Sequence, residues 1–232
     1  MRIASTIFIV LLASVLLLSA NTILSSLNII FHENAFVNSI LKYQLFALAI
    51  AMLILIGTLQ ITPESKRLLH VGNLDSPAIK EKWLGINGKT SWRKNGFQLA
   101  FFISTSTGIF MFLAVKYTNN LDNFMWSYVP IILIISFTNS FSEEMIYRFA
   151  INGNLITLPS NYRIYIISAI LFGLPHYQGY PSGILGVIMA GALGYILSKA
   201  THETKGIAVA WGIHFLQDII IFTSLFMMNV RA

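Results

Sequence analysis

The feature that most constrains the fold is a succession of apolar segments, most of them long enough to cross a lipid bilayer. Residues 3–31 contain no acidic or basic side chain, and further apolar segments follow along the chain. A helix needs about 20 mainly apolar residues to span a bilayer. We therefore predict an all-α, polytopic transmembrane helical bundle with about seven membrane spans. The expected spans are residues 3–31, 37–61, 97–116, 130–154, 163–176, 182–198 and 206–229.

The composition supports a membrane protein. Hydrophobic residues make up 56% of the chain and charged residues 10%, whereas soluble domains contain about 25% charged residues. The absence of cysteine excludes disulfides, thiolate catalysis and cysteine-ligated metals. The net charge of +6 is explained by basic loops that face the cytoplasm and anionic lipid. The expected partner is therefore the lipid bilayer and not nucleic acid.

A polar segment, residues 62–96, separates two N-terminal spans from the other five. This segment contains more basic than acidic residues, and a basic excess beside membrane spans indicates a cytoplasmic loop. We therefore predict a multi-pass protein of the cell membrane with a cytoplasmic N-terminus. We expect a two-span region over 1–96 and a core over 97–232, together one compact membrane domain. The first twenty residues also resemble a signal peptide, but the apolar run continues past them and favours a retained helix. The basic residues of the polar segment are Lys66, Arg67, Lys80, Lys82, Lys89, Arg93 and Lys94.

Ionisable residues lie well inside three of the expected spans, all in the C-terminal half of the chain. Each such group costs about 2.5–3.5 kcal/mol at the centre of a bilayer, and buried ones normally face one another or a water-filled cavity. We therefore predict one shared polar site between these three helices. Its candidate residues are Glu143, Glu144 and Arg148 in the fourth span, His176 in the fifth, and His214 and Asp218 in the seventh.

Helical spacing assigns different roles to the two adjacent glutamates. Glu144 and Arg148 are four residues apart with the acid first, which favours an ion pair. Glu143 points about 100° away around the helix and is free to face the site. We therefore expect Glu144 and Arg148 to support the structure and Glu143 to take part in the chemistry.

The other two helices that carry site residues also have informative patterns. His214 and Asp218 are four residues apart and project from one face. Pro175 precedes His176 and should weaken the helical hydrogen bonding there. Between these helices, the sixth span has small residues at intervals of four, which predict close packing against another helix. These small residues are Gly186, Ala190 and Gly194.

This combination of side chains fits the hydrolysis of an amide bond by an activated water molecule. A carboxylate beside a histidine can hold and deprotonate water, and a second histidine with an acid or amide partner can stabilise an oxyanion. Two histidines and a glutamate could instead bind zinc with one open position. The zinc ligands would then be Glu143, His176 and His214, and the residues alone leave both mechanisms open.

Three motifs in this order resemble a known family. They are Glu143-Glu144-x-x-x-Arg148, Phe172-x-x-x-His176 and His214-x-x-x-Asp218. They look like the signature motifs of the CPBP family, the CAAX proteases and bacteriocin-processing intramembrane proteases, also called the Abi family. The approach to the third span, from Trp83-Leu84-Gly85 to Trp92, is typical of this family too. The resemblance covers roughly residues 130–222.

The resemblance implies a membrane-embedded endopeptidase. In this family Glu143 and His176 would activate water, and His214 with residue 218 would form the oxyanion site. No cofactor is certain and zinc is the candidate, since the family was long classified among the metalloproteases, whereas an archaeal prenyl-protease relative looks glutamate-dependent. Prenyl proteases usually have asparagine where this chain has Asp218. An ionised aspartate cannot donate to an oxyanion, so Asp218 would have to be protonated, orient His214 or bind a metal.

Two other functions compete with proteolysis. The protease would cleave a peptide or protein, prenylated or bacteriocin-like, near the cytoplasmic leaflet, in CAAX-type processing, peptide maturation or bacteriocin self-immunity. The alternative is a non-catalytic immunity or scaffold protein of the membrane that binds a bacteriocin or a receptor. A cation or proton transporter is a third interpretation, and it is weakened because no inverted repeat is evident in the sequence.

Overall fold

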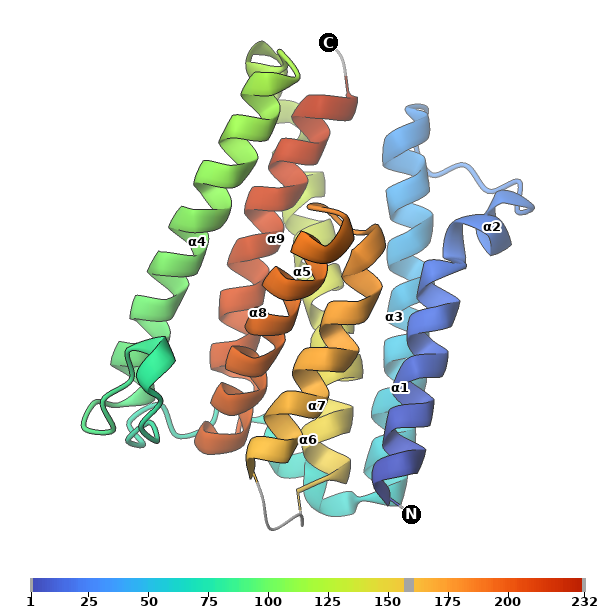
Figure 1. Ribbon diagram of the computed structural model, residues 1–232. Helices are drawn as coiled ribbons and strands as arrows, with labels where there is room; N and C mark the ends of the chain where they lie inside the picture. Colours follow the sequence, from blue (N-terminus) through green and yellow to red (C-terminus); the bar gives the residue numbers. More distant parts are fainter. Residues whose placement is uncertain (1, 157–160, 231–232) are drawn as a thin grey trace.

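The computed structural model describes residues 2–156 and 161–230, which form a bundle of helices running roughly side by side (Figure 1). No strand occurs in these two ranges, where the β-pairing consists of isolated bridges in the polar segment. The predicted all-α membrane bundle is confirmed. Its α-helices are α1 (Arg2–Leu18), α2 (Ala20–Ser25), α3 (Ala35–Ile61), α4 (Trp92–Tyr117), α5 (Val129–Glu144), α6 (Ala150–Asn154), α7 (Asn161–Gly173), α8 (Gly183–Thr204) and α9 (Ala208–Asn229).

Five helices of the described chain are long and apolar enough to cross a membrane. They are α3, α4, the continuous helical stretch Trp126–Asn154, α8 and α9. Two of the seven expected spans correspond to the shorter helices α1 and α7. The number of spans therefore stays a prediction for these two. Pro159, which the sequence places between the expected fourth and fifth spans, lies outside the described residues.

The first apolar run does not form one helix over residues 3–31. Helix α1 ends at Leu18, and α2 continues after Ser19 at an angle to it (Figure 1). The hydroxyls of Ser25 and Ser26 bond to carbonyls three residues back, and the helix stops there. Serine and threonine compete in this way with the helical hydrogen bonds. The helix predicted from the apolar character of residues 3–31 was therefore too long.

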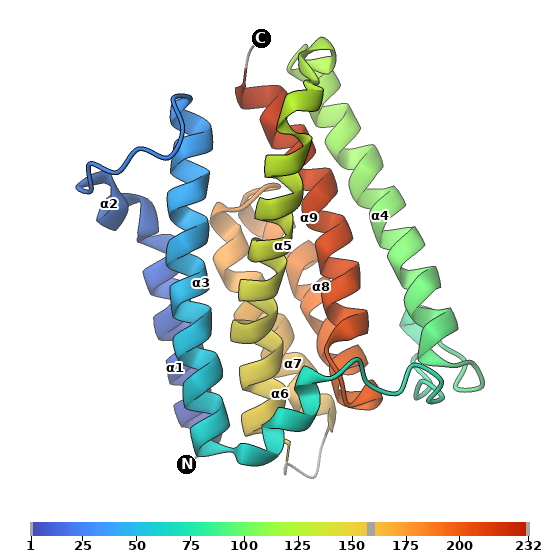
Figure 2. The same ribbon diagram turned by 180° about the vertical axis from the view of Figure 1, so that it is seen from behind.

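The third expected span also begins earlier than predicted. Helix α4 starts at Trp92 with Ser91 as its N-cap residue, so the last residues of the polar segment, from Trp92 onward, already belong to the spanning helix. Trp92 is buried, and its indole Nε1 donates to Glu203 Oε2 at 3.0 Å. From this anchor α4 runs at an angle along one side of the bundle (Figure 2), with large apolar side chains such as Phe101 and Phe102 exposed.

One large apolar core joins the N-terminal helices to the rest of the bundle. It contains Val10 of α1 and Ala51 of α3 together with residues of the later helices such as Phe149 and Phe172. A buried hydrogen bond of 2.8 Å between Ser14 Oγ and Tyr147 Oη connects α1 to the helical stretch that carries the paired glutamates. The walls of the polar site are therefore assembled from both ends of the chain.

The small residues of α8 allow the close approach that we predicted. A Cβ added at Gly194 would lie 3.1 Å from Phe172 Cβ, and one added at Gly186 would lie 2.6 Å from the carbonyl oxygen of His176. Ala190 on the same face is buried. This packing holds α7, and the turn of helix after it, in a fixed position against α8.

Candidate active site

The paired glutamates lie where the long helix of α5 changes its winding. After Glu144 the chain forms one segment of π-helix, Met145–Phe149, before α6 continues. Such widened turns often occur at functional sites. Arg148 nevertheless pairs with Glu144 as predicted, with 2.9 Å between Arg148 Nη2 and Glu144 Oε1, and both side chains are fully buried.

Glu144 has a second partner that sequence reasoning missed. Its Oε1 also lies 2.8 Å from His214 Nδ1, so one carboxylate oxygen connects α5 to α9. The guanidinium of Arg148 lies over the ring of Phe172, 3.9 Å from the ring centre, a favourable cation–π contact. Helical spacing within one segment indicated the ion pair, but it could not place a side chain of another helix.

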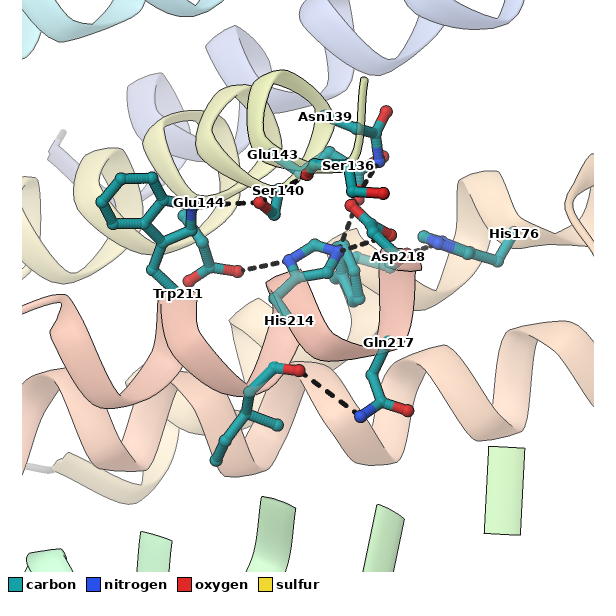
Figure 3. A network of polar contacts seen from close by, with 12 residues as sticks. Ser136, Asn139, Ser140, Glu143, Glu144, His176, Trp211, His214, Gln217 and Asp218 are labelled. Carbon is teal, nitrogen blue, oxygen red and sulfur yellow. Dashed lines mark hydrogen bonds and ion pairs between the residues drawn. The ribbon is translucent and has the colours of Figure 1, made fainter. Parts of the chain in front are cut away.

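Four side chains form a closed ring of polar contacts (Figure 3): Asn139, Glu143, His214 and Asp218. Asn139 Nδ2 donates to Glu143 Oε1 at 3.3 Å and to Asp218 Oδ2 at 3.1 Å. On the opposite side, His214 Nε2 lies 3.4 Å from Glu143 Oε2 and 3.8 Å from Asp218 Oδ1. Each of the two carboxylates therefore lies between the asparagine amide and the imidazole.

Asn139 is the member of this ring that the sequence analysis missed. It is buried and precedes Glu143 by four residues, so both project from the same face of α5. The signal in the sequence was a polar amide within an apolar span, one turn before a candidate catalytic carboxylate. A search restricted to ionisable groups does not find such a residue.

His176 approaches the ring from a different direction (Figure 3). It lies in the 3-10 helix Leu174–Gln178, because the α-helical pattern of α7 ends at Gly173, two residues before Pro175. His176 Nδ1 is 2.7 Å from the carbonyl oxygen of Phe172. A carbonyl oxygen can only accept, so Nδ1 carries the proton and Nε2 of the neutral ring is left as an acceptor.

A cavity of about 280 Å³ brings the four predicted catalytic residues together, since Glu143, His176, His214 and Asp218 all line it. Most of its remaining wall is apolar and comes from α4, α8 and α9. This wall includes Ile103, Phe110, Met189, Leu193, Ile221 and Phe222. The volume and the polar base are suited to an extended apolar chain with a peptide bond at one end.

A second cavity of about 230 Å³ adjoins the first and shares Glu143, His176 and Gly179 with it. The other residues of the second cavity come from the N-terminal helices, the π-helical segment and the 3-10 helix, and they include Tyr43 and Tyr147. The carboxylate and the imidazole thus lie between an apolar cavity and a more polar one.

The described residues do not present a ready metal site. Nowhere in residues 2–156 and 161–230 are three His, Cys, Asp or Glu side chains grouped closely enough to hold a metal ion. Glu143, His176 and His214, the ligands that we considered for zinc, line one cavity but do not converge in this way. The geometry of these three side chains therefore does not fit a zinc site. Zinc binding stays a prediction, which a metal assay would test.

Comparison with known proteins agrees with the sequence motifs. A family model described as type II CAAX prenyl endopeptidase Rce1-like matches residues 124–220. This segment runs from the start of the helical stretch that carries the paired glutamates to the middle of α9 and includes all three motifs. Comparison with curated proteins and with solved structures gives no significant match. The resemblance to the CPBP family is confirmed over this segment, and it supports an intramembrane endopeptidase in general.

Proposed function

We propose that this chain, whose residues 124–220 form an Rce1-like type II CAAX prenyl endopeptidase domain, hydrolyses a peptide bond within the membrane by a water molecule held between Glu143 and His176. The observation that carries the proposal is the shared position of these two side chains at the meeting point of two cavities. A carboxylate and a histidine acceptor at one water-accessible point can bind and deprotonate water.

In the proposed reaction Glu143 takes a proton from the water molecule while the water oxygen attacks the carbonyl carbon of the substrate. Nε2 of His176 accepts the other hydrogen of this water, because Nδ1 already donates to the Phe172 carbonyl. The proton on Glu143 then passes to the leaving nitrogen as the C–N bond breaks. The products are a carboxylic acid and an amine, which balances the addition of one water molecule.

His214 is the candidate stabiliser of the oxyanion. Nδ1 faces Glu144 at 2.8 Å and Nε2 faces Glu143 at 3.4 Å, an arrangement that an imidazolium satisfies because both of its nitrogens donate. The Nε2–H group lies at the cavity, where it can turn from Glu143 to the negative oxygen of the tetrahedral intermediate.

Asp218 fits the orienting role best among the three that its chemistry left open. It accepts a hydrogen bond from Asn139 at 3.1 Å and lies 3.8 Å from His214 Nε2. An acceptor in this position needs no proton of its own. We propose that it holds the charged ring of His214 at the cavity and does not contact the oxyanion.

The apolar cavity favours a substrate with a lipophilic portion. Its walls are mostly aromatic and aliphatic side chains, and its polar base is limited to the ring residues and their neighbours. We propose a peptide or protein whose segment near the cleaved bond is strongly apolar, either prenylated or bacteriocin-like. CAAX-type processing, peptide maturation and bacteriocin self-immunity would each provide such a substrate.

The test uses purified protein in detergent with an internally quenched peptide that ends in an S-farnesylated cysteine and three further residues, beside the same peptide without the farnesyl group. Glu143→Gln should lower kcat by at least about 10²-fold, because the amide cannot take the proton. Glu64→Gln, at an exposed position in the short 3-10 helix Pro63–Leu69, should keep the activity of the natural chain.

Two outcomes would contradict the proposal. One is equal cleavage by Glu143→Gln and the natural chain, and the other is cleavage of neither peptide by the natural chain. If neither is cleaved but the peptides bind, the non-catalytic binding protein becomes the better interpretation. Metal analysis of the same preparation, with and without a chelator, decides whether zinc takes part.

A further inference from the structure

The polar contacts of the site continue into α3, outside the segment that matches the protease family. Gln44 of α3 donates from Nε2 to Asn139 Oδ1 at 3.2 Å. Both side chains are buried, with 4% of Gln44 and 8% of Asn139 exposed. Figure 2 shows α3 running beside α5. The ring around the carboxylates therefore has a support that the catalytic motifs do not include.

The surroundings of Asn139 determine which way its amide must face. Its Nδ2 donates to two carboxylates, Glu143 and Asp218, and an ionised carboxylate can only accept. The amide therefore turns its NH₂ group toward the site and its oxygen toward α3. That buried oxygen needs a donor, and Gln44 provides it.

The other end of the Gln44 amide meets a hydroxyl. Thr138 Oγ1 lies 3.2 Å from Gln44 Oε1. It also lies 3.0 Å and 3.1 Å from the carbonyl oxygens of Ile134 and Ile135, so its one hydrogen has three acceptors within reach. When this hydrogen points to Gln44, the donors run in one direction, from Thr138 through Gln44 and Asn139 to the carboxylates. If the donor of Gln44 were lost, the Asn139 amide could turn, and its oxygen would face the carboxylates.

We propose that Gln44 is a positioning residue of the catalytic site. It keeps the NH₂ group of Asn139 toward Glu143 and Asp218, and in this way fixes the directions in which the two carboxylates point. The inference rests on the proposed peptidase function. It adds that α3, which lies outside residues 124–220, helps to orient the catalytic side chains.

The experiment measures kcat and KM, with the farnesylated peptide, for the natural chain, Gln44→Met, Asn139→Leu and the double variant. Gln44→Met should lower kcat about tenfold and leave KM within about twofold, because the cavity walls are unchanged. Asn139→Leu should lower kcat by about 10²-fold, the usual effect of a misplaced catalytic group. The double variant should match Asn139→Leu alone, because Gln44 acts through Asn139.

Gln60→Met is the matched control, since Gln60 lies on the same helix with an exposed side chain, and it should keep the natural kcat. A natural kcat in Gln44→Met would overturn the inference, as would losses that multiply in the double variant. If Gln44→Met does not accumulate, Gln44→Leu replaces it. The leucine side chain cannot donate to Asn139, so an undiminished kcat in Gln44→Leu would overturn the inference equally.

Failure of the inference can be distinguished from failure of the proposed function. If the natural chain cleaves neither peptide, the peptidase function is refuted, and the unfolding temperatures of the same four proteins then test the inference. The lowering of the unfolding temperature should be clearly less than additive in the double variant, because both substitutions remove the same hydrogen bond. Additive losses would overturn the positioning role without any measurement of activity.

Discussion

At the scale of single residues, Glu144 has a second role in the site beside its ion pair with Arg148. One of its oxygens meets both Arg148 Nη2 and His214 Nδ1. The side chain that balances the buried arginine is thus the one that orients the histidine of α9. Structural support and catalytic geometry therefore depend on one carboxylate.

Replacement of Glu144 should affect stability first. In Glu144→Ala the guanidinium of Arg148 stays fully buried without its carboxylate, and an uncompensated buried charge costs about 3–5 kcal/mol. We expect a lower unfolding temperature and less protein in the membrane, measured against Glu64→Ala at an exposed position.

The double variant Glu144→Leu/Arg148→Met separates the two roles of Glu144. Without either charge much of the stability should return, but activity should not, because His214 has lost its partner at Nδ1. Natural stability in Glu144→Ala, or activity restored in the double variant, would show that Glu144 does not act as a shared anchor.

The sequence predicted the residues of the site better than their contacts. The four candidate catalytic residues line one cavity, and Glu144 pairs with Arg148 as the spacing indicated. The bond between Glu144 and His214, and the place of Asn139 in the ring, depend on how α5 and α9 are packed. Periodicity within one helix contains no information on such packing.

At the scale of the elements, the apolar runs predicted which segments are helical, but local hydrogen bonds decided where the helices end or change. Serine hydroxyls end α2, and Pro175 lies where α7 gives way to a 3-10 helix. The π-helical segment after Glu144 has no proline or glycine that would have indicated it. His176 depends on such a change, since it lies just after the end of α7.

The contact of α8 with this 3-10 helix should therefore control the position of His176. In Gly186→Ala the new Cβ would clash with the carbonyl oxygen of Pro181 and lie 2.6 Å from that of His176, and such overpacking costs about 1–3 kcal/mol. We expect a lower unfolding temperature and a reduced kcat, measured with the farnesylated peptide.

Gly108→Ala in α4 is the control for this substitution. Nothing lies within 4 Å of the added Cβ, and alanine is a better helix former than glycine by about 1 kcal/mol. Gly108→Ala should thus be as stable as the natural chain or more so. If Gly186→Ala behaved like this control, the close packing of α8 would not determine the position of His176.

At the scale of the whole molecule, the basic polar segment and the catalytic cavity lie toward opposite ends of the bundle. The N-terminus, the polar segment before α4 and the α8–α9 connection lie at one end, and the C-terminus and the α4–α5 connection at the other (Figures 1 and 2). The cavity reaches from the ring to Gly186 near the start of α8 and to Leu225 near the end of α9. It therefore extends toward the end that carries the C-terminus.

The predicted orientation has a consequence for substrate entry. If the basic loops face the cytoplasm as predicted, the end with the C-terminus is the outer one and the cavity extends toward the outer leaflet. From the sequence we predicted substrate entry near the cytoplasmic leaflet, and the direction of the cavity favours the other side. We expect the peptide to reach Glu143 from the outer side.

Single cysteines test this orientation without background, because the natural chain has none. In intact cells a membrane-impermeant maleimide should label Asp122→Cys, in the α4–α5 connection, and Tyr180→Cys, at the cavity wall. Lys89→Cys, in the basic polar segment, should be labelled only after the membrane is permeabilised. If Tyr180→Cys were labelled only together with Lys89→Cys, the cavity would open to the cytoplasm and the outer route would be wrong. If Asp122→Cys and Lys89→Cys exchanged their behaviour, the basic loops would face outward and the predicted cytoplasmic N-terminus would be wrong as well.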